Sequence, residues 1–356
     1  MLVLLAACAQ RPAAPPTSTP VAQATDSAAP TVPPPTATLP PPTDTPPPPT
    51  PTDVPASTPF AGTTTASPTP LASVAAIGVM IDNDPHARPQ TGLNAASVVY
   101  EMPAEFNLTR FLAIYFANAP KTVGSIRSTR PYFATVMTEY GGGLVHCLDV
   151  PGVSTILDQG NVFNFDLCRG AGEEGAFRVS SRPAPFNLYV NAALLQGELR
   201  LRPPRHAAAL LQRAPLPSTA SDATSVSIVY PYPEHPEYAH TVQWSWNGQA
   251  YERQQDGDVH READGTVVTT DVVVVQRTRV LPTRYFGEAG YHVVDLIGSG
   301  DATILAGGKS LSVHWKRTGI DQPTVFTDAA GHTLALPTGR VFFDVVPTDA
   351  KVDVRA

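Results

Sequence analysis

Five acidic and arginine residues gather in one short and mostly apolar stretch of the chain, residues 94–133. They are two glutamates and three arginines, namely Glu101, Glu105, Arg110, Arg127 and Arg130. Guanidinium groups bind carboxylates and phosphates through paired hydrogen bonds, and carboxylates can transfer protons or neutralise buried cations. The stretch is therefore expected to be either a polar site on a rigid scaffold or a network of buried ion pairs.

The arginines predict a surface that binds anions. Arg127 and Arg130 lie just before Pro131, which suits the first turn of a helix, and the amino end of a helix attracts negative charge. Two more arginines lie in a loop and before a second expected helix. The predicted ligand-binding set is Arg88, Arg110, Arg127, Arg130 and Arg182. The expected ligand is an anionic wall polymer, peptidoglycan or a protein partner.

The same charges also allow a purely structural interpretation. In it, Arg110 pairs with Glu101 across a hairpin. Arg127 or Arg130 then pairs with Glu105, and no ligand is involved.

A catalytic interpretation is the alternative function. Glu101 and Glu105 with His146 would act as a cell-wall hydrolase, because glycoside hydrolysis uses two carboxyl groups about 5 to 9.5 Å apart. The arginines nearby are expected to lower the pKa of both glutamates, which suits a base or nucleophile better than an acid. The leading expectation is a non-enzymatic binding protein.

No cofactor or metal site is predicted. His146 and Asp149 are close in sequence, with Asp84 and His86 upstream, but their spacing matches no closed metal centre. No phosphate-binding glycine loop or nucleophile elbow is present in the sequence.

The amino terminus predicts the compartment. Leu5-Ala6-Ala7-Cys8 resembles the bacterial lipobox, so residues 1–8 are expected to be a lipoprotein signal with Cys8 as the acylated residue. The apolar run is short for a signal peptide, and a start upstream of Met1 is expected. The protein should be anchored by lipid to the extracytoplasmic face of the cell membrane.

Residues 9–74 are expected to be a disordered tether. Twenty of the 39 prolines lie in residues 1–70, with fifteen threonines and almost no large apolar residues. The whole chain has a formal net charge of −7, which gives no basic surface for nucleic acid. In an oxidising compartment Cys147 and Cys168 are a disulfide candidate, while two free thiols or a catalytic thiol are the alternatives.

The remaining sequence predicts two domains. Residues 75–212 combine apolar strands at 76–82, 97–101 and 109–116 with helices, which indicates an α+β domain. Residues 213–225 have the composition of a linker. Residues 226–349 contain short strands separated by turns such as Asn247-Gly248, which is typical of an all-β sandwich or barrel.

The chain resembles a known family, the YerB-like bacterial lipoproteins, whose two modules are both named domain of unknown function 3048. The resemblance rests on the segments Ala87–Leu93, Val99–Glu101, Leu108–Leu112, Gly124–Tyr132, Arg182–Tyr189, Tyr251–Arg253, Gly298–Gly300 and His314–Lys316. It implies an extracytoplasmic lipoprotein with two modules and implies no activity. This chain departs from the family pattern at Glu105-Phe106-Asn107, at Phe186 and after His146, so a site built on those groups is expected to be altered.

Overall fold

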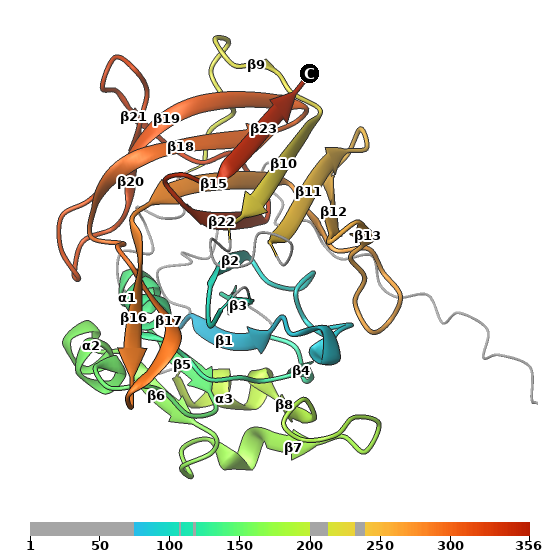
Figure 1. Ribbon diagram of the computed structural model, residues 1–356, viewed down its shortest axis with the longest axis vertical. Helices are drawn as coiled ribbons and strands as arrows, with labels where there is room; N and C mark the ends of the chain where they lie inside the picture. The colour runs from blue at the N-terminus through green and yellow to red at the C-terminus, as the bar shows by residue number, and fades with distance from the viewer. Residues whose placement is uncertain (1–74, 107, 117–118, 200–212, 232–238) are drawn as a thin grey trace, which may run out of the picture. The chain divides into compact units, whose positions relative to one another are not determined.

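The computed structural model describes residues 75–106, 108–116, 119–199, 213–231 and 239–356 (Figure 1). These residues form a mixed α/β structure, mostly strands, with three α-helices. The expected signal with Cys8 and the expected tether lie outside the described residues. Within the described part, no helix is both long and apolar enough to cross a membrane.

A twelve-stranded sheet takes strands from both halves of the sequence. From the first half come β1 (Ile77–Asp82), β2 (Val98–Pro103), β3 (Thr109–Tyr115), β5 (Gly143–His146) and β6 (Phe163–Asp166). From the second half come β9 (Ser221–Asp222), β15 (Val272–Thr278), β18 (Gly298–Ala306), β19 (Lys309–Arg317), β20 (Val325–Thr327), β21 (Thr333–Leu334) and β22 (Val341–Pro347). The order is β21-β20-β19-β18-β15-β22-β2-β3-β1-β5-β6, and β9 pairs with β19.

Strand β22 joins the two halves of this sheet. It runs parallel to both β15 and β2, and the rings of Tyr100 and Phe343 stack 4.3 Å apart across the β2–β22 junction. Strand β22 is mostly apolar and is buried along nearly its whole length, as is typical of a strand covered on both faces. The C-terminal region is largely antiparallel β as expected, but β22 lies beside β2 instead of closing a separate sandwich or barrel. The domain boundaries at 75–212 and 226–349 stay a prediction.

The remaining strands form three smaller sheets. The six-stranded sheet contains β10 (Ser225–Tyr230), β11 (His240–Trp246), β12 (Tyr251–Gln255), β13 (Asp258–Val259), β14 (Thr269–Thr270) and β23 (Lys351–Arg355). The three-stranded sheet contains β4 (Val123–Gly124), β7 (Ala176–Arg178) and β8 (Leu188–Val190), and the hairpin contains β16 (Val280–Tyr285) and β17 (Glu288–Val294). The predicted turn at Asn247-Gly248 does connect β11 and β12. The segment 213–225, expected to be a linker, carries β9.

The helices are α1 (Pro131–Tyr140), α2 (Val153–Gly160) and α3 (Ala192–Glu198), with 3-10 turns η2 at Pro85–Ala87 and η3 at Glu173–Gly175. Helix α1 begins at Pro131 as predicted and ends at Gly141, whose φ of 73° requires a residue that tolerates the left-handed region. The second helix expected after Arg182 starts only at Ala192, because Leu188–Val190 first forms β8.

The central strands are buried on both faces, and this decides where charges can lie. On β1, Val79 and Ile81 belong to one core cluster, whereas Met80 belongs to a second cluster with Met137 of α1. Successive side chains of a strand point to opposite faces, so a charge within these strands enters a core. Charges that reach solvent are expected at the strand ends.

Candidate functional site

The charged residues of the predicted site gather where β1 ends. Strands β1, β5 and β6 run parallel, so their carboxyl ends share one edge of the sheet, a place where α/β proteins often bind ligands. Asp82 is the last residue of β1, and Arg110 lies opposite it on β3. The segment 124–130 passes the same edge, where the Asp82 amide donates a hydrogen bond to the Ser125 carbonyl at 2.9 Å. Figure 1 shows this end of β1, in blue, beside β4.

Glu105 holds two of the arginines in a buried ion pair. Its carboxylate accepts hydrogen bonds from Arg110 Nη2 at 2.6 Å and from Arg130 Nη2. The side chains of Arg110 and Arg130 are only 6% and 7% exposed, and burial lowers the pKa of each guanidinium. Arg130 also lies 5.3 Å from the ring centroid of Tyr291. These two arginines are therefore engaged in contacts within the protein.

The pairing of Arg110 with Glu101, expected in the structural interpretation, does not occur. On the β2–β3 ladder Arg110 lies opposite Met102, and Glu101 lies opposite Phe111. Because neighbouring residues of a strand face opposite sides of the sheet, this register places Glu101 and Arg110 on opposite faces. The other expected pairing, of Arg130 with Glu105, is present.

Arg127 differs from the other arginines at this edge. Its side chain is 34% exposed, and its Nε lies 3.1 Å from Asp82 Oδ2 without hydrogen-bond geometry. Its guanidinium carbon lies 6.0 Å from the ring centroid of Phe186, and the Phe186 ring stacks on His86 at 5.4 Å. Within the described part of the chain, the Nη groups of Arg127 donate no hydrogen bond. We call Asp82, Ser125, Arg127 and Phe186 the edge site.

Buried polar atoms without hydrogen-bond partners concentrate around the edge site. In the described residues, five of seven such side-chain atoms lie here: Asp82 Oδ2, Arg110 Nε, Ser125 Oγ, Arg127 Nε and Arg130 Nε. Buried polar atoms are usually hydrogen-bonded, and each exception asks for an explanation. The edge site thus combines an accessible guanidinium with hydrogen-bonding capacity that the protein does not use.

Two further arginines of the predicted set brace the loop after β1. Arg182 donates to the carbonyls of Ala87 and Pro89, the latter at 2.5 Å. Arg88 donates to the Asn83 carbonyl at 2.9 and 3.1 Å and lies 3.2 Å from Asp256 Oδ2. Both guanidinium groups bind groups of the protein itself, and their predicted roles as ligand contacts stay predictions.

Glu101 lies in a second, closed arrangement that we call the inner network. Its members are Asn83, Glu101, Thr109, His240, Arg253 and Asp344. Arg253 Nη2 donates to Glu101 at 2.5 Å, Thr109 donates at 2.6 Å, and His240 Nε2 lies 3.1 Å away. Burial would raise the pKa of Glu101, but the Arg253 charge and the bond with His240 hold that pKa far below its usual value. Neither Glu101 nor Arg253 has any exposed side-chain surface.

Asp344 completes the inner network from β22. It lies opposite Glu101 on the neighbouring parallel strand and accepts a hydrogen bond from Trp244 Nε1 at 2.9 Å. Burial and the nearby Glu101 carboxylate raise the pKa of Asp344 to about 8. Asp344 is therefore mostly protonated at neutral pH beside an ionised Glu101.

His146 belongs to a third cluster at the ends of β5 and β6. Its ring nitrogens lie 2.9 Å from the Leu148 carbonyl and 2.6 Å from Asn164 Oδ1. Asp149 and Asp166 are close enough to share an ion with His146, but Arg169 Nη1 already lies 2.6 Å and 2.8 Å from these two carboxylates. The arginine supplies the positive charge, so the cluster supports no metal proposal.

A disulfide bond links the two strand ends of this third cluster. Cys147 and Cys168 are joined across a separation of 21 residues, with their Cα atoms 4.9 Å apart. It ties the loop after β5 to the loop after β6 and leaves neither sulfur as a free thiol.

The three residues of the catalytic interpretation occupy three separate networks. Glu105 is held by arginines, Glu101 lies in the inner network, and His146 contacts Asn164. Both Glu101 and His146 are 0% exposed. A hydrolase needs its carboxyl groups at one substrate-accessible place, and the structure does not bring these three side chains together.

Sequence reasoning missed most of the inner network, although signals were present. The run of residues 251–255 alternates, and its inward positions place Arg253 beside Tyr251 in the interior. Asp344 is a lone acid within an apolar strand. His240 begins β11 and contacts the carboxylates of Glu101 and Asp256.

Comparison with known proteins identifies related sequences and a related structure. The N-terminal domain of the protein of unknown function DUF3048 matches residues 61–204, and its C-terminal domain matches residues 228–343. The chain is 27% identical over 290 residues to "Putative lipoprotein YerB" of Bacillus subtilis (strain 168), covering 76% of this chain and 81% of that protein. The crystal structure of Bacillus subtilis YerB superposes with a TM-score of 0.66 at 24% identity, covering 83% of this chain and 98% of that one, which shows a shared fold.

Proposed function

This chain belongs to the DUF3048 family, and we propose that it is a lipid-anchored, extracytoplasmic binding protein that holds an anionic component of the cell envelope at the edge site. The anchor would be Cys8, as the lipobox-like sequence and the name of the YerB relative both support. The ligand would present a carboxylate or phosphate, from an anionic wall polymer, from peptidoglycan or from an acidic segment of a protein.

One observation carries this proposal: Arg127 is the partly exposed guanidinium among the predicted arginines at this edge. A guanidinium with free Nη groups can form two parallel hydrogen bonds to a carboxylate or phosphate. The Phe186 ring beside Arg127 provides an apolar wall that limits competition from water.

The neighbouring charges explain why the site would be selective. Glu105 pairs with both Arg110 and Arg130, and Asp82 faces Arg127, so these three arginines and two carboxylates together carry one net positive charge. Binding would then depend on the geometry of one guanidinium instead of a broad positive field. The hydrolase alternative finds less support, since Glu101 and His146 have no surface for a substrate to touch.

The test is retention of the protein on purified cell-wall material. The full chain carrying Cys8→Ala cannot be acylated, so its retention does not depend on a lipid. Because a hydrogen bond to a charged group contributes about 1.5 to 3 kcal/mol, Arg127→Gln should weaken binding by about tenfold or more. Arg178→Gln, at an exposed arginine of β7, is the matched control and should bind as the parent does.

Two wall preparations separate the sources of the anion. Loss of binding when the anionic polymer is stripped from the wall would identify the polymer as the ligand. Equal binding to stripped wall would identify peptidoglycan carboxylates. Equal dissociation constants for the parent, Arg127→Gln and Arg178→Gln on both preparations would refute wall binding at the edge site.

A further inference from the structure

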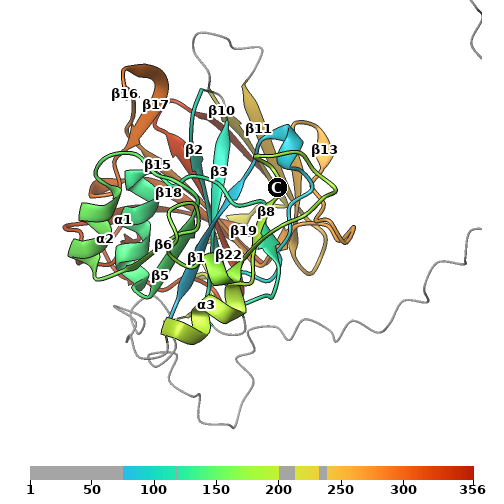
Figure 2. The same ribbon diagram turned by 90° about the horizontal axis from the view of Figure 1, so that it is seen from below.

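The β16–β17 hairpin stands apart from the larger sheets. Among the described strands, these two pair only with each other, and Phe286 and Gly287 connect them. Figure 2 shows the hairpin, in brown, rising from the body at the upper left. The hairpin contributes no residue to the edge site or to the inner network, so neither accounts for its composition.

The hairpin carries an exposed apolar surface that we call the hairpin patch: Phe106, Leu281, Phe286, Val293 and Ile297. These five are among the eleven large hydrophobic side chains exposed in the described residues, and Phe286 is the most exposed of all at 73%. Leu281 and Val293 are opposite each other on the two strands, so they share one face. Phe106 joins the patch because its ring lies against Gly290 of β17.

The tip of the hairpin shows that the exposed aromatic ring is not incidental. Phe286 has a φ of 54° and Gly287 a φ of 84°. Two-residue turns with both φ angles positive usually place Asn or Asp before Gly, because bulky side chains are disfavoured there. The chain places a phenylalanine in this position and exposes its ring, which favours a role for the ring at the surface.

The hairpin is poorly suited to other kinds of docking. Pro282 has no amide hydrogen, so β16 cannot offer a continuous edge to an added strand. The charges nearby have both signs, since Arg279 pairs with Asp295 at 2.5 Å, and Arg284 of β16 and Glu288 of β17 carry opposite charges. Nonpolar contact is therefore the interaction that the hairpin offers.

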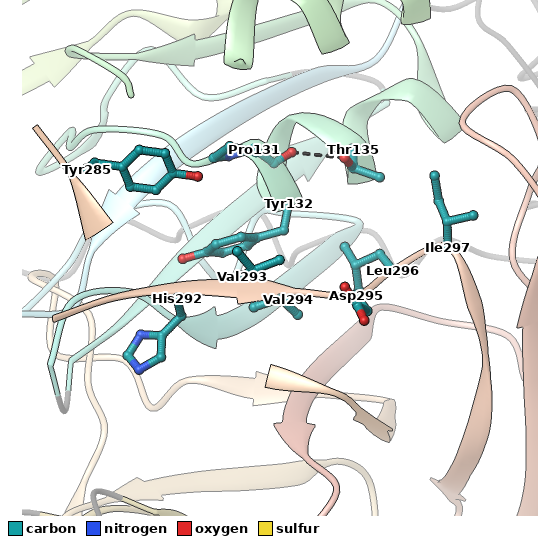
Figure 3. Close-up of a pocket in the computed structure, with 10 residues that line it drawn as sticks. All are labelled: Pro131, Tyr132, Thr135, Tyr285, His292, Val293, Val294, Asp295, Leu296 and Ile297. Carbon is teal, nitrogen blue, oxygen red and sulfur yellow. Dashed lines mark hydrogen bonds between the residues drawn. The ribbon is translucent and has the colours of Figure 1, made fainter. Parts of the chain in front are cut away.

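Two cavities flank the hairpin. One of about 230 Å³ lies between the hairpin and the first turn of α1, where Figure 3 shows Tyr285 and Thr135 on either side of Pro131. The other, of about 460 Å³, is lined by Phe106, Pro282 and Tyr291 among others. Apolar chains that surround the hairpin would find room on both of its sides.

We propose that the hairpin patch inserts into the interfacial layer of the lipid membrane that carries the protein, with lipid acyl chains as its occupant. Apolar side chains gain free energy on leaving water, and the tyrosines behind the tip, Tyr285 and Tyr291, are of the type enriched at membrane surfaces. The proposal rests on the lipid anchoring in the proposed function, because a chain tethered through Cys8 presents the hairpin at high effective concentration. A weak insertion is then enough to orient the body on the membrane.

Insertion is tested directly with a fluorescent label. The full chain with Cys8→Ala has Cys147 and Cys168 in a disulfide, so Phe286→Cys gives one labelling site. A polarity-sensitive dye at position 286 should shift to the blue when vesicles of phosphatidylcholine with phosphatidylglycerol are added. The same dye at Phe177→Cys, an exposed aromatic position of β7, should not respond.

Vesicle co-sedimentation of the Cys8→Ala chain measures how much the hairpin patch contributes to membrane binding. Since burial of a large apolar side chain is favourable, Phe286→Ser should lower the partition coefficient by about tenfold. Leu281→Ser should lower it by less, and Leu194→Ser on α3 is the matched control.

Three outcomes overturn the insertion. They are no dye response at position 286, binding that Phe286→Ser leaves unchanged, and binding that requires anionic lipid and is lost with Arg284→Gln instead. The first would leave the hairpin patch to another occupant such as a protein partner, the second would place the membrane contact elsewhere on the body, and the third would identify a charged headgroup as the ligand. A negative result in these vesicle assays does not bear on wall retention through Arg127, which is measured separately.

Discussion

The inner network and the edge site are built from the same residue types and behave in opposite ways. In the inner network, Glu101 contacts four side chains, and neither it nor Arg253 is exposed. In the edge site, Arg127 is a third exposed, and several buried polar atoms have no hydrogen-bond partner among the described residues. Among the described residues, the inner network leaves one buried polar atom, Arg253 Nε, without a hydrogen-bond partner, and the edge site leaves three. The inner network is closed to solvent, and the edge site is not.

The difference shows that charge content alone does not identify a site. A buried ion pair is a poor indicator of function, because its groups satisfy each other and cannot reach a ligand. What distinguishes a ligand site is accessible surface together with hydrogen-bonding capacity that the protein leaves unused. By that criterion Arg127 stands out from Arg110 and Arg130, although all three belong to one short stretch of sequence.

The largest expected effect is the loss of Arg253. Arg253→Met leaves Glu101 as a buried carboxylate without its principal counter-charge, so the free energy of unfolding should fall by about 3 to 5 kcal/mol. Chemical denaturation measures this, and Arg261→Met, at an exposed arginine nearby, is the control. Adding Glu101→Gln to Arg253→Met should recover much of the loss. A loss below about 1 kcal/mol would mean that the inner network does not hold the two halves together.

The second expected effect concerns pH and Asp344. The pKa of Asp344 is about 8 in the folded chain against an ordinary 3.8, so the folded state binds this proton more tightly than the unfolded state does. The contribution of Asp344 to the free energy of unfolding therefore falls as the pH rises from about 4 to about 8, and it is level above that.

Asp344→Asn removes this titration and can keep the hydrogen bond from Trp244. The difference in free energy of unfolding between variant and parent should move in favour of the variant from pH 4 to pH 8. Equilibrium denaturation across that range gives the difference curve. A flat curve would show that Asp344 is already ionised beside Glu101.

Much of the first region could be predicted from local sequence. Apolar runs marked β1, β2 and β3, and Pro131 marked the start of α1, because strand burial and helix initiation depend on neighbouring residues. The short connection also predicted that β2 and β3 pair antiparallel, as they do. Which residues face each other needed the register, and a shift of one residue separates Glu101 from Arg110.

The long-range pairings could not be predicted in this way. Strand β22 follows β2 by more than two hundred residues, and no local pattern states that they are neighbours. The partner of Glu101, Arg253, likewise comes from the other half of the chain. The alternation of residues 251–255 is compatible with an inward Arg253 but does not say which carboxylate it would meet.

Glu105 provides an intermediate case between the two regions. Glu105→Gln removes the carboxylate that Arg110 and Arg130 share, leaving two poorly exposed guanidinium groups without it. The free energy of unfolding should fall by about 2 kcal/mol, less than for Arg253→Met because Glu105 is 14% exposed and water can reach it. Thermal and chemical denaturation measure the change. A change below about 0.5 kcal/mol would indicate that solvent already compensates these arginines.

Arg127 should give the smallest effect on stability. A partly exposed ion pair contributes little, so Arg127→Gln is expected to change the free energy of unfolding by less than about 0.5 kcal/mol. The same variant is expected to lose wall retention, and this separation of stability from binding is what sets the edge site apart. If Arg127→Gln destabilised the chain as much as Glu105→Gln, Arg127 would be a structural arginine like Arg110 and Arg130. Its contact with Asp82 would then explain its place at the end of β1 without any ligand.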